Sequence, residues 1–423
     1  MDVLSIARNN RFKFLCLLAL NVAIYVNYKT FLFTFMFFIF VLIKENIVLN
    51  NYESILFKLI PINYYFNAIY STFKNNPYSS FFWDMQNFLH YLRCNTGPYI
   101  NEYKFINEKI SCPDSIGYGP LVEYIQFTFA GIWEITVLIG VLFLIVLTIF
   151  LIFSKKNLYL IVPILISPGF HFLIFSLNTD LIVLLYIFFL LKTKELEYKN
   201  SNFIILTIIT LIKTYTVMLF FGYLIKFIVD KKSKYAVLTL SYFLLNTIIL
   251  IYHYYYQNSL LPSPLSFTRS FGLLHDFRLV FDNIGFDEVG YLAIGLLIIS
   301  ILFKNKLDLN KIEIKLSETI IIDKVIVFFP LCFLINVYAN WGYKFVFNSL
   351  FIYIIYPYSN KLLKVLFILT NLLVTTYYSI GWGFTENLYN YFMISTSKVF
   401  FYFYFLFSIY VFVIAVLNKV DKK

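Results

Sequence analysis

The sequence is poor in charged residues. Only 13% of its 423 residues are Asp, Glu, Lys or Arg, whereas a soluble domain carries about 25%. This shortage excludes a soluble enzyme and a disordered chain. The composition also excludes a secreted disulfide scaffold, and the four cysteines include no CxxC pair, which disfavours a metal site. P-loop, GxGxxG, HExxH and GxSxG motifs are also absent, so ATP hydrolysis, dinucleotide binding and zinc-protease chemistry have no support.

Apolar residues dominate what is there. They make up 60% of the chain, and the mean hydropathy is +0.76. We therefore expect an all-α fold: a polytopic membrane helical bundle of about 11–14 spans, forming one integral membrane domain over residues 1–423. Some apolar runs are shorter than the ~20 residues that cross a bilayer, and these are candidates for re-entrant or broken helices. The expected spans are 13–28, 30–43, 54–73, 131–153, 158–177, 181–191, 202–213, 216–229, 235–256, 290–303, 324–339, 345–358, 362–381 and 398–418.

The net charge of +11 is interpreted as a topology signal rather than as a nucleic-acid surface. When the N-terminus is placed in the cytoplasm, most of the 34 Lys and Arg residues fall in inner segments, and both termini are cytoplasmic. The first apolar stretch lacks a small-residue cleavage site and is interpreted as a retained helix. Two long outer loops result, 74–130 and 257–289, with an inner loop at 304–323.

The two long polar loops on the outer face favour a reaction with a lipid-linked substrate at that face. Cys94 and Cys112 share the first outer loop, where a disulfide closing it would add roughly 3 kcal/mol, although two free thiols are the alternative. The chain has no Asn-x-Ser/Thr sequon despite its many asparagines, which favours a bacterial inner (plasma) membrane.

Two carboxylates in the first outer loop are candidates for catalysis. Asp84 follows the third expected span and is flanked by aromatic residues, including Trp83. A partly desolvated carboxylate at such a boundary suits a general base, while a helix N-cap or a solvated loop residue is the alternative. Asp114 lies in a Gly- and Pro-rich segment with Tyr118, where a structural turn is the alternative.

Polar residues also interrupt the later apolar runs. Asn178 and Asp180 lie at a tight outer turn after Ser167-Pro168 and could bind a sugar or a cation, unless they only cap the turn. Lys213 lies between two apolar runs without a neighbouring acid, so we expect a phosphate anion as its partner, with snorkelling to the interface as the alternative.

A second lysine lies between two late spans. Lys344 could contact a phosphate, with Trp341 and Tyr343 stacking beside it, and an aromatic belt is the alternative. Arg269 in the second outer loop is a weaker candidate of the same kind.

The order of these segments resembles the GT-C superfamily of polytopic glycosyltransferases, and most of all bacterial family 87, the polyprenol-phosphate-mannose-type transferases. The similarity covers roughly residues 50–360. Two departures are that no proline follows Lys213 and that the first loop has no Asp-x-Asp pair. The segments that carry the resemblance are Trp83-Asp84, Tyr118 to Leu121, Ser167-Pro168, Asn178 with Asp180, Leu211 to Tyr215, and Tyr343-Lys344.

The resemblance implies a GT-C-like fold and a hexosyltransferase of the cell envelope. It would move mannose or another hexose or pentose from a polyprenyl-phosphate donor to a lipid- or glycan-linked acceptor at the outer face. Asp84 would be the base of an inverting displacement, and Lys213, Lys344 and Arg269 would hold the donor phosphate. No cofactor is implied with certainty, and a divalent metal stays open. The residues assigned to the sugar and acceptor are Asn178, Asp180, Asp114, Tyr118, Tyr215 and Tyr343.

Two other classes remain open on the sequence alone. A polysaccharide polymerase or ligase would have a similar number of spans, although it would be expected to use more outer arginines than this chain has. A transporter or lipid flippase would have broken helices near the midplane together with repeat symmetry, and only the broken segments are seen. Membrane lipids are expected partners in every case, and nucleic acid in none.

Overall fold

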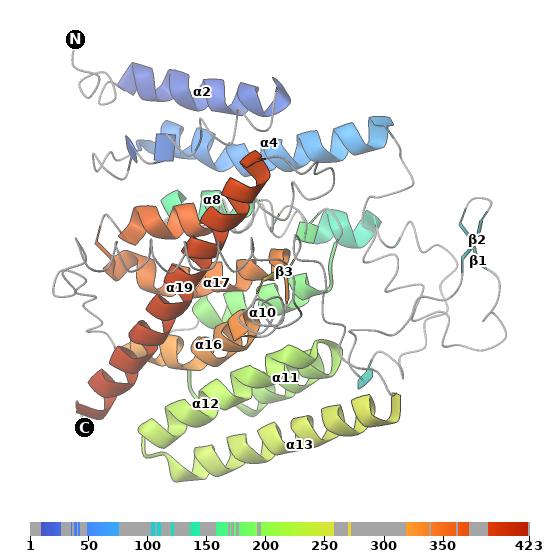
Figure 1. Ribbon diagram of the computed structural model, residues 1–423, viewed down its shortest axis with the longest axis vertical. Helices are drawn as coiled ribbons and strands as arrows, with labels where there is room; N and C mark the ends of the chain where they lie inside the picture. The colour runs from blue at the N-terminus through green and yellow to red at the C-terminus, as the bar shows by residue number, and fades with distance from the viewer. Residues whose placement is uncertain are drawn as a thin grey trace.

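The computed structural model is built of helices, with two short β ribbons (Figure 1). Its elements are α2 (Asn10–Val26), α4 (Asn51–Asn75), β1 (Tyr103–Phe105), β2 (Glu108–Ile110), α8 (Leu158–Leu165), α10 (Asp180–Lys192), α11 (Asn200–Ile212), η1 (Thr214–Thr216), α12 (Val217–Val229), α13 (Ser233–Gln257), β3 (Ser270–Phe271), α16 (Thr319–Val337), β4 (Asn340–Trp341), η3 (Gly342–Phe345), α17 (Val346–Ile355), η4 (Tyr356–Tyr358) and α19 (Leu388–Asp421). The residues that it describes are 10–26, 35, 38–39, 41–42, 49–75, 103–105, 108–110, 120–121, 135, 137–143, 158–167, 170, 173–174, 177–192, 196–257, 270–271, 319–337, 340–360, 363–371 and 388–421.

The two N-terminal helices, α2 and α4, pack side by side along one edge of the molecule (Figure 1). A capping box starts α4: the Asn50 backbone N–H donates to Glu53 Oε2 at 2.8 Å, and the Glu53 N–H donates to Asn50 Oδ1 at 2.9 Å. The same Glu53 carboxylate, which is buried, lies 3.5 Å from Lys13 Nζ on α2. One acid therefore both begins α4 and ties it to α2.

Helix α8 is shorter than the expected span 158–177, because it ends at Leu165. Ser167 forms the turn, where its hydroxyl donates to the Ile164 carbonyl at 2.7 Å. Hydroxyl-to-backbone bonds of this kind compete with continued helix. The chain then reaches a tight turn at Leu177, which has a φ of +48°, and enters α10 at Asp180.

The helices α11, α12 and α13 form a layer at the opposite edge from α2 and α4 (Figure 1). Lys213 ends α11 with an extended backbone, at φ −128° and ψ 98°, and a single 3₁₀ turn, η1, leads into α12. These three helices match the expected spans 202–213, 216–229 and 235–256 to within two residues at each end.

Helix α16 packs between α12 and α19, and its closest approach is to α12. Gly222 makes this approach possible, because a Cβ at that position would lie 2.1 Å from the backbone oxygen of Val327. Helix α16 begins at Thr319, so the last residues of the expected loop 304–323 are helical. Helix α19 begins at Leu388, earlier than the expected 398.

The turn between α16 and α17 pairs with the second long loop. Strand β3 is antiparallel to β4, with Ser270 opposite Trp341 and Phe271 opposite Asn340. Strands β1 and β2 form a separate hairpin inside the first long loop. The β3–β4 pairing fixes part of the 257–289 loop against the turn that carries η3.

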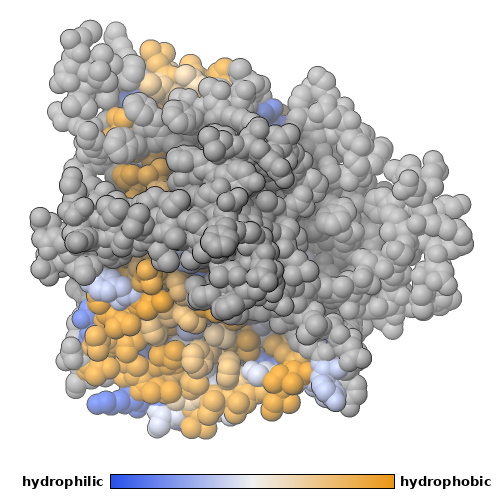
Figure 2. Space-filling view, in the orientation of Figure 1, coloured by the Kyte–Doolittle hydropathy of each residue, from blue (hydrophilic) through white to orange (hydrophobic). Residues whose placement is uncertain are grey.

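Within the described part of the chain, three helices are long and apolar enough to cross a membrane: Ser233–His253 in α13, Ile320–Val337 in α16 and Phe400–Val420 in α19. The α16 segment is 67% buried within the protein, whereas the α13 segment is only 17% buried. Apolar side chains cover the outer surface of the α11–α13 layer (Figure 2). The expected helical, apolar architecture is confirmed at this level.

A polar layer lies inside the α16–α17–α19 region. Asn336 and Asn348, both fully buried, exchange amide hydrogen bonds of 3.2 and 2.7 Å between α16 and α17. The hydroxyl of Tyr404 on α19 donates to the backbone oxygen of Asn348 at 3.2 Å. Buried amides are costly unless they are paired, so these bonds fix the start of α17 relative to its neighbours.

Candidate functional site

Four helix ends meet at one place in the bundle. They are the start of α10, the end of α11, the turn η1 before α12, and η3 before α17. Asp180, Lys213, Tyr215 and Lys344 come from these four ends and interact with one another. Helix ends expose unpaired backbone groups and dipole charge, which makes such a junction suited to polar chemistry in an apolar bundle.

Asp180 is the centre of this junction. Its carboxylate is fully buried and lies 3.0 Å from Lys213 Nζ. Its backbone N–H donates to Asn178 Oδ1 at 2.8 Å, so the Asn178 side chain caps the first turn of α10. A carboxylate in the first turn of a helix also interacts favourably with the helix dipole. The position of Asp180 is thus set by α10 itself.

Lys213 reaches Asp180 because α11 breaks at this residue. The Thr216 hydroxyl donates to the Lys213 carbonyl at 2.8 Å, which satisfies a backbone group that the break releases. Thr216 also shares a hydrogen bond of 2.9 Å with the Thr210 hydroxyl, across the break. These two threonines, both fully buried, hold the kink that directs Lys213 away from the apolar surface.

Lys344 approaches the same carboxylate from η3. Its Nζ lies 5.1 Å from the centre of the Tyr215 ring, a cation–π geometry, and its charge interacts with Asp180 and Lys213. Burial lowers the pKa of the Lys344 ammonium, and the charge of Asp180 opposes that shift. Tyr215 is held edge-on against Phe347 of α17, at 5.6 Å between ring centres.

Two lysines interact with one carboxylate in this junction. Asp180 pairs with Lys213, and the charge of Lys344 also acts on it. Lysine ammonium groups in surroundings where a charge is poorly solvated favour anionic partners. A phosphodiester is such an anion, and it would accept charge-assisted hydrogen bonds from lysine.

The structure brings together residues that the sequence predicted separately. Asn178, Asp180, Lys213, Tyr215 and Lys344 converge, and Tyr343 belongs to the same η3 turn. The sequence predicts a phosphate as the partner of Lys213. The structure shows that Asp180 is also a partner, which the sequence does not reveal because the two residues are far apart along the chain. The candidates that lie outside the described residues are Asp84, Asp114, Tyr118, Arg269, Cys94 and Cys112.

Sequence reasoning missed Thr210 and Thr216, which support the kink at Lys213. The sequence feature that could have indicated this support is the pair of threonines on either side of Lys213. Threonine is common in apolar runs, so the feature is weak. Among the described residues, no three His, Cys, Asp or Glu side chains gather as a metal site would require. The described cysteines, Cys16 and Cys332, are not joined in a disulfide.

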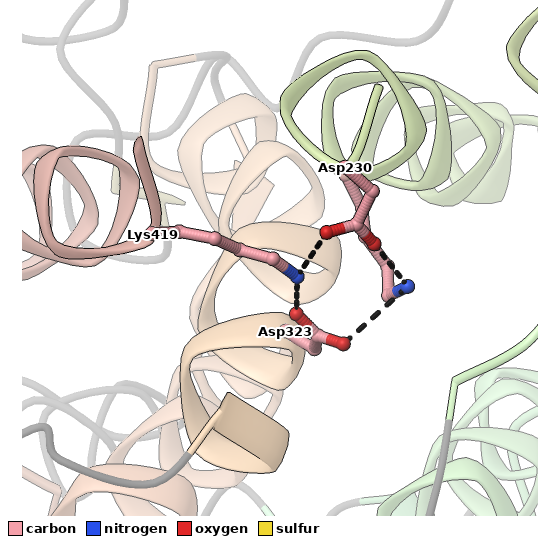
Figure 3. Close-up of polar contacts among 4 residues, drawn as sticks. Asp230, Asp323 and Lys419 are labelled. Carbon is pink, nitrogen blue, oxygen red and sulfur yellow. Dashed lines mark hydrogen bonds and ion pairs between the residues drawn. The ribbon is translucent and has the colours of Figure 1, made fainter. Parts of the chain in front are cut away.

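A second charged cluster ties together the far ends of α12, α16 and α19 (Figure 3). Asp230 accepts a hydrogen bond from Lys226 at 2.8 Å and lies 2.9 Å from Lys419 Nζ. Asp323 lies 3.3 Å from Lys226 Nζ and accepts a hydrogen bond from Lys419. These two acids and two lysines form a closed ring of ion pairs.

No protein family, curated protein or solved structure matches the chain.

Proposed function

We propose that the chain is a membrane glycosyltransferase that moves a sugar from a polyprenyl-phosphate donor to a lipid- or glycan-linked acceptor at the outer face of a bacterial inner membrane. The observation that carries the proposal is the convergence of Lys213 and Lys344 on Asp180. A site with two cations and one acid suits a donor whose leaving group is a phosphate monoester of a lipid. The resemblance to the GT-C superfamily points to the same chemistry.

The arrangement of helix ends supports a polytopic topology of about 11–14 spans with cytoplasmic termini. Contacts join segments that the positive-inside rule assigns to one side: Lys213 meets Asp180 at the proposed outer side, and Lys419 meets Asp230 at the proposed inner side. The pairing of β3 with β4 likewise joins two segments assigned to the outer side.

The proposed reaction is a single displacement. The acceptor hydroxyl oxygen attacks the anomeric carbon as Asp84 takes its proton, and the bond between that carbon and the phosphate oxygen breaks. Lys213 and Lys344 stabilise the charge that develops on the leaving lipid phosphate. Asp180 keeps both ammonium groups oriented and offsets part of their repulsion. One displacement inverts the configuration of the sugar.

The test uses membranes that contain the full chain and polyprenyl-phosphate-[³H]mannose as the donor. Transfer of label to a lipid or glycan product is measured for the unaltered protein and for Asp84→Asn, Lys213→Gln and Lys344→Gln. We expect Asp84→Asn to abolish transfer, and each lysine variant to lower kcat/KM by about a hundredfold, which corresponds to the loss of one charge-assisted contact.

The matched control is Lys199→Gln. Lys199 is exposed at the other end of the same helix, α11, and it should leave transfer unchanged. Undiminished transfer by Asp84→Asn or by both lysine variants, with normal membrane expression, would overturn the assigned roles. If the unaltered protein transfers neither mannose nor other hexoses or pentoses from this class of donor, the transferase proposal fails, and the transporter and polymerase readings gain support.

A further inference from the structure

Helix α13 turns an unusually large part of its surface away from the protein. Only 17% of its apolar segment Ser233–His253 is buried, compared with 67% for α16 and 50% for α19. Its exposed side chains include Val237, Leu245, Ile248 and Ile251. Apolar side chains gather over the α11–α13 layer in the space-filling view (Figure 2). A face of this extent in contact with water is costly, so an apolar partner is required.

The two ends of α13 differ in chemistry. Three exposed lysines, Lys231, Lys232 and Lys234, occur in the turn that enters the helix. Two exposed tyrosines, Tyr252 and Tyr255, occur near its other end. Aromatic residues favour the membrane interface, and clustered lysines favour the anionic headgroups of lipids. The apolar face therefore lies between a basic end and an aromatic end.

The acid nearest to the lysines does not neutralise them. Asp230 is held by Lys226 and Lys419 in the closed ring of Figure 3, at 2.8 and 2.9 Å. The adjacent segment, whose Tyr198 stacks on Tyr235 at 5.2 Å, adds one exposed acid, Glu197, and one exposed base, Lys199. Among the residues that the structure describes around it, the turn thus has an excess of three positive charges.

The backbone of the turn adds a second, independent observation. Lys231 has a φ of +56°, and its N–H bonds to the Ile228 carbonyl at 3.0 Å while the Lys232 N–H bonds to Phe227 at 2.9 Å. This is the Schellman ending of α12, in which the left-handed position is usually glycine. Lys231 therefore occupies a position that favours glycine, at a steric cost that Lys231→Gly would remove.

We infer that the α12–α13 turn binds the headgroup phosphate of an anionic phospholipid, whose acyl chains lie along the exposed face of α13. The ligand is a lipid rather than free phosphate, because the basic turn and the apolar face form one continuous surface. Lys231, Lys232 and Lys234 supply the charge, and the ring around Asp230 keeps that charge from being cancelled. This lipid site is separate from the junction at Asp180, and it does not depend on the transferase reaction.

The experiment measures binding of fluorescently labelled phosphatidylglycerol and phosphatidylcholine to the full chain in detergent at low salt. We expect phosphatidylglycerol to bind about tenfold or more tightly than phosphatidylcholine, because each lysine adds a several-fold preference for the anionic lipid. Replacing Lys231, Lys232 and Lys234 together by Gln should remove that preference, and replacing them by Arg should retain it. Size-exclusion profiles of the variants establish that each is folded.

Lys104→Gln with Lys109→Gln is the matched control, because it removes two lysines from the β1–β2 hairpin. This control should keep the lipid preference. Persistence of the preference in the triple Gln variant would overturn the inference, as would its equal loss in the control or the complete displacement of the lipid by inorganic phosphate. Lys231→Gly should raise the melting temperature by relieving the left-handed position while weakening phosphatidylglycerol binding. If binding is undiminished in Lys231→Gly, the headgroup does not use that side chain.

Discussion

The carboxylate of Asp180 and the ammonium of Lys213 form an ion pair of 3.0 Å between the start of one helix and the end of another. The Asp180 side chain is fully buried, and the Lys213 side chain is 12% exposed. Removing both charges from water is costly, and the attraction between the two groups offsets part of that cost.

The first prediction concerns this pair. Asp180→Asn should destabilise the protein by about 3–5 kcal/mol, because Lys213 would lose the buried carboxylate that pairs with it. The measurement is thermal or denaturant unfolding of the purified protein in detergent. The double variant Asp180→Leu with Lys213→Leu should be more stable than Asp180→Asn, since it removes both members of the ion pair rather than the carboxylate alone. Equal stability of Asp180→Asn and the unaltered protein would mean that the ion pair does not form.

The second prediction is a pH dependence. Burial lowers the pKa of Lys344, so this lysine is charged at low pH and loses its charge at a lower pH than an ordinary lysine does. If Lys344 binds the donor phosphate, the KM for the donor should rise as the pH increases through that lowered pKa. Lys344→Arg should remove this rise, because arginine stays protonated. A KM profile that is identical in the two proteins would exclude Lys344 from donor binding.

The third prediction concerns the crossing of α12 and α16. Gly222→Ala should destabilise the protein by about 1–3 kcal/mol or more, because the new methyl group would overlap the backbone of Val327. The melting temperature of the purified variant measures the effect. Adding Val327→Ala should not restore stability, since the contacts are with backbone atoms rather than with the valine side chain. Recovery of stability in that double variant would show that the alanine at position 222 overlaps the Val327 side chain rather than its backbone.

The fourth prediction concerns the closed ring of ion pairs at the opposite end of α12. Asp323→Asn leaves two lysines with one acid, and we expect a loss of up to about 3 kcal/mol in stability. Asp323→Asn combined with Lys419→Gln restores the balance of charge and should recover part of that loss. Urea unfolding of the three proteins in parallel gives the comparison. No recovery in the double variant would indicate that the ring acts through shape rather than through charge.

Hydropathy predicted the helices well because apolar runs directly reflect burial and length. The bounds of α10, α11, α12 and α13 differ by two residues or fewer from the expected spans. The prediction was poorer where local polar groups decide the outcome. Helix α8 ends at Leu165, and Ser167 forms a turn within the apolar run. A mean hydropathy over many residues does not detect the effect of a single serine.

The candidate site was predicted in parts but not as a unit. Single polar residues at membrane depth, such as Lys213 and Asp180, were recognisable because their isolation is costly. Their pairing was not, because it depends on which helix ends are neighbours in space. The Asn336–Asn348 amide pair and the Gly222 contact are hidden for the same reason: each partner resembles an ordinary residue of an apolar helix.

The ring around Asp230 also has a consequence for how the protein is assembled during synthesis. Lys226 and Asp230 leave the ribosome together, but Lys419 follows Asp323 by 96 residues. Until α19 has been made, Lys226 pairs with Asp230 and Asp323 without Lys419, the second lysine of the ring. A nascent chain that stalls before α19 therefore lacks the ion pairs of Lys419, which join α19 to the ends of α12 and α16. We expect such a chain to be more sensitive to membrane proteases than the full-length chain.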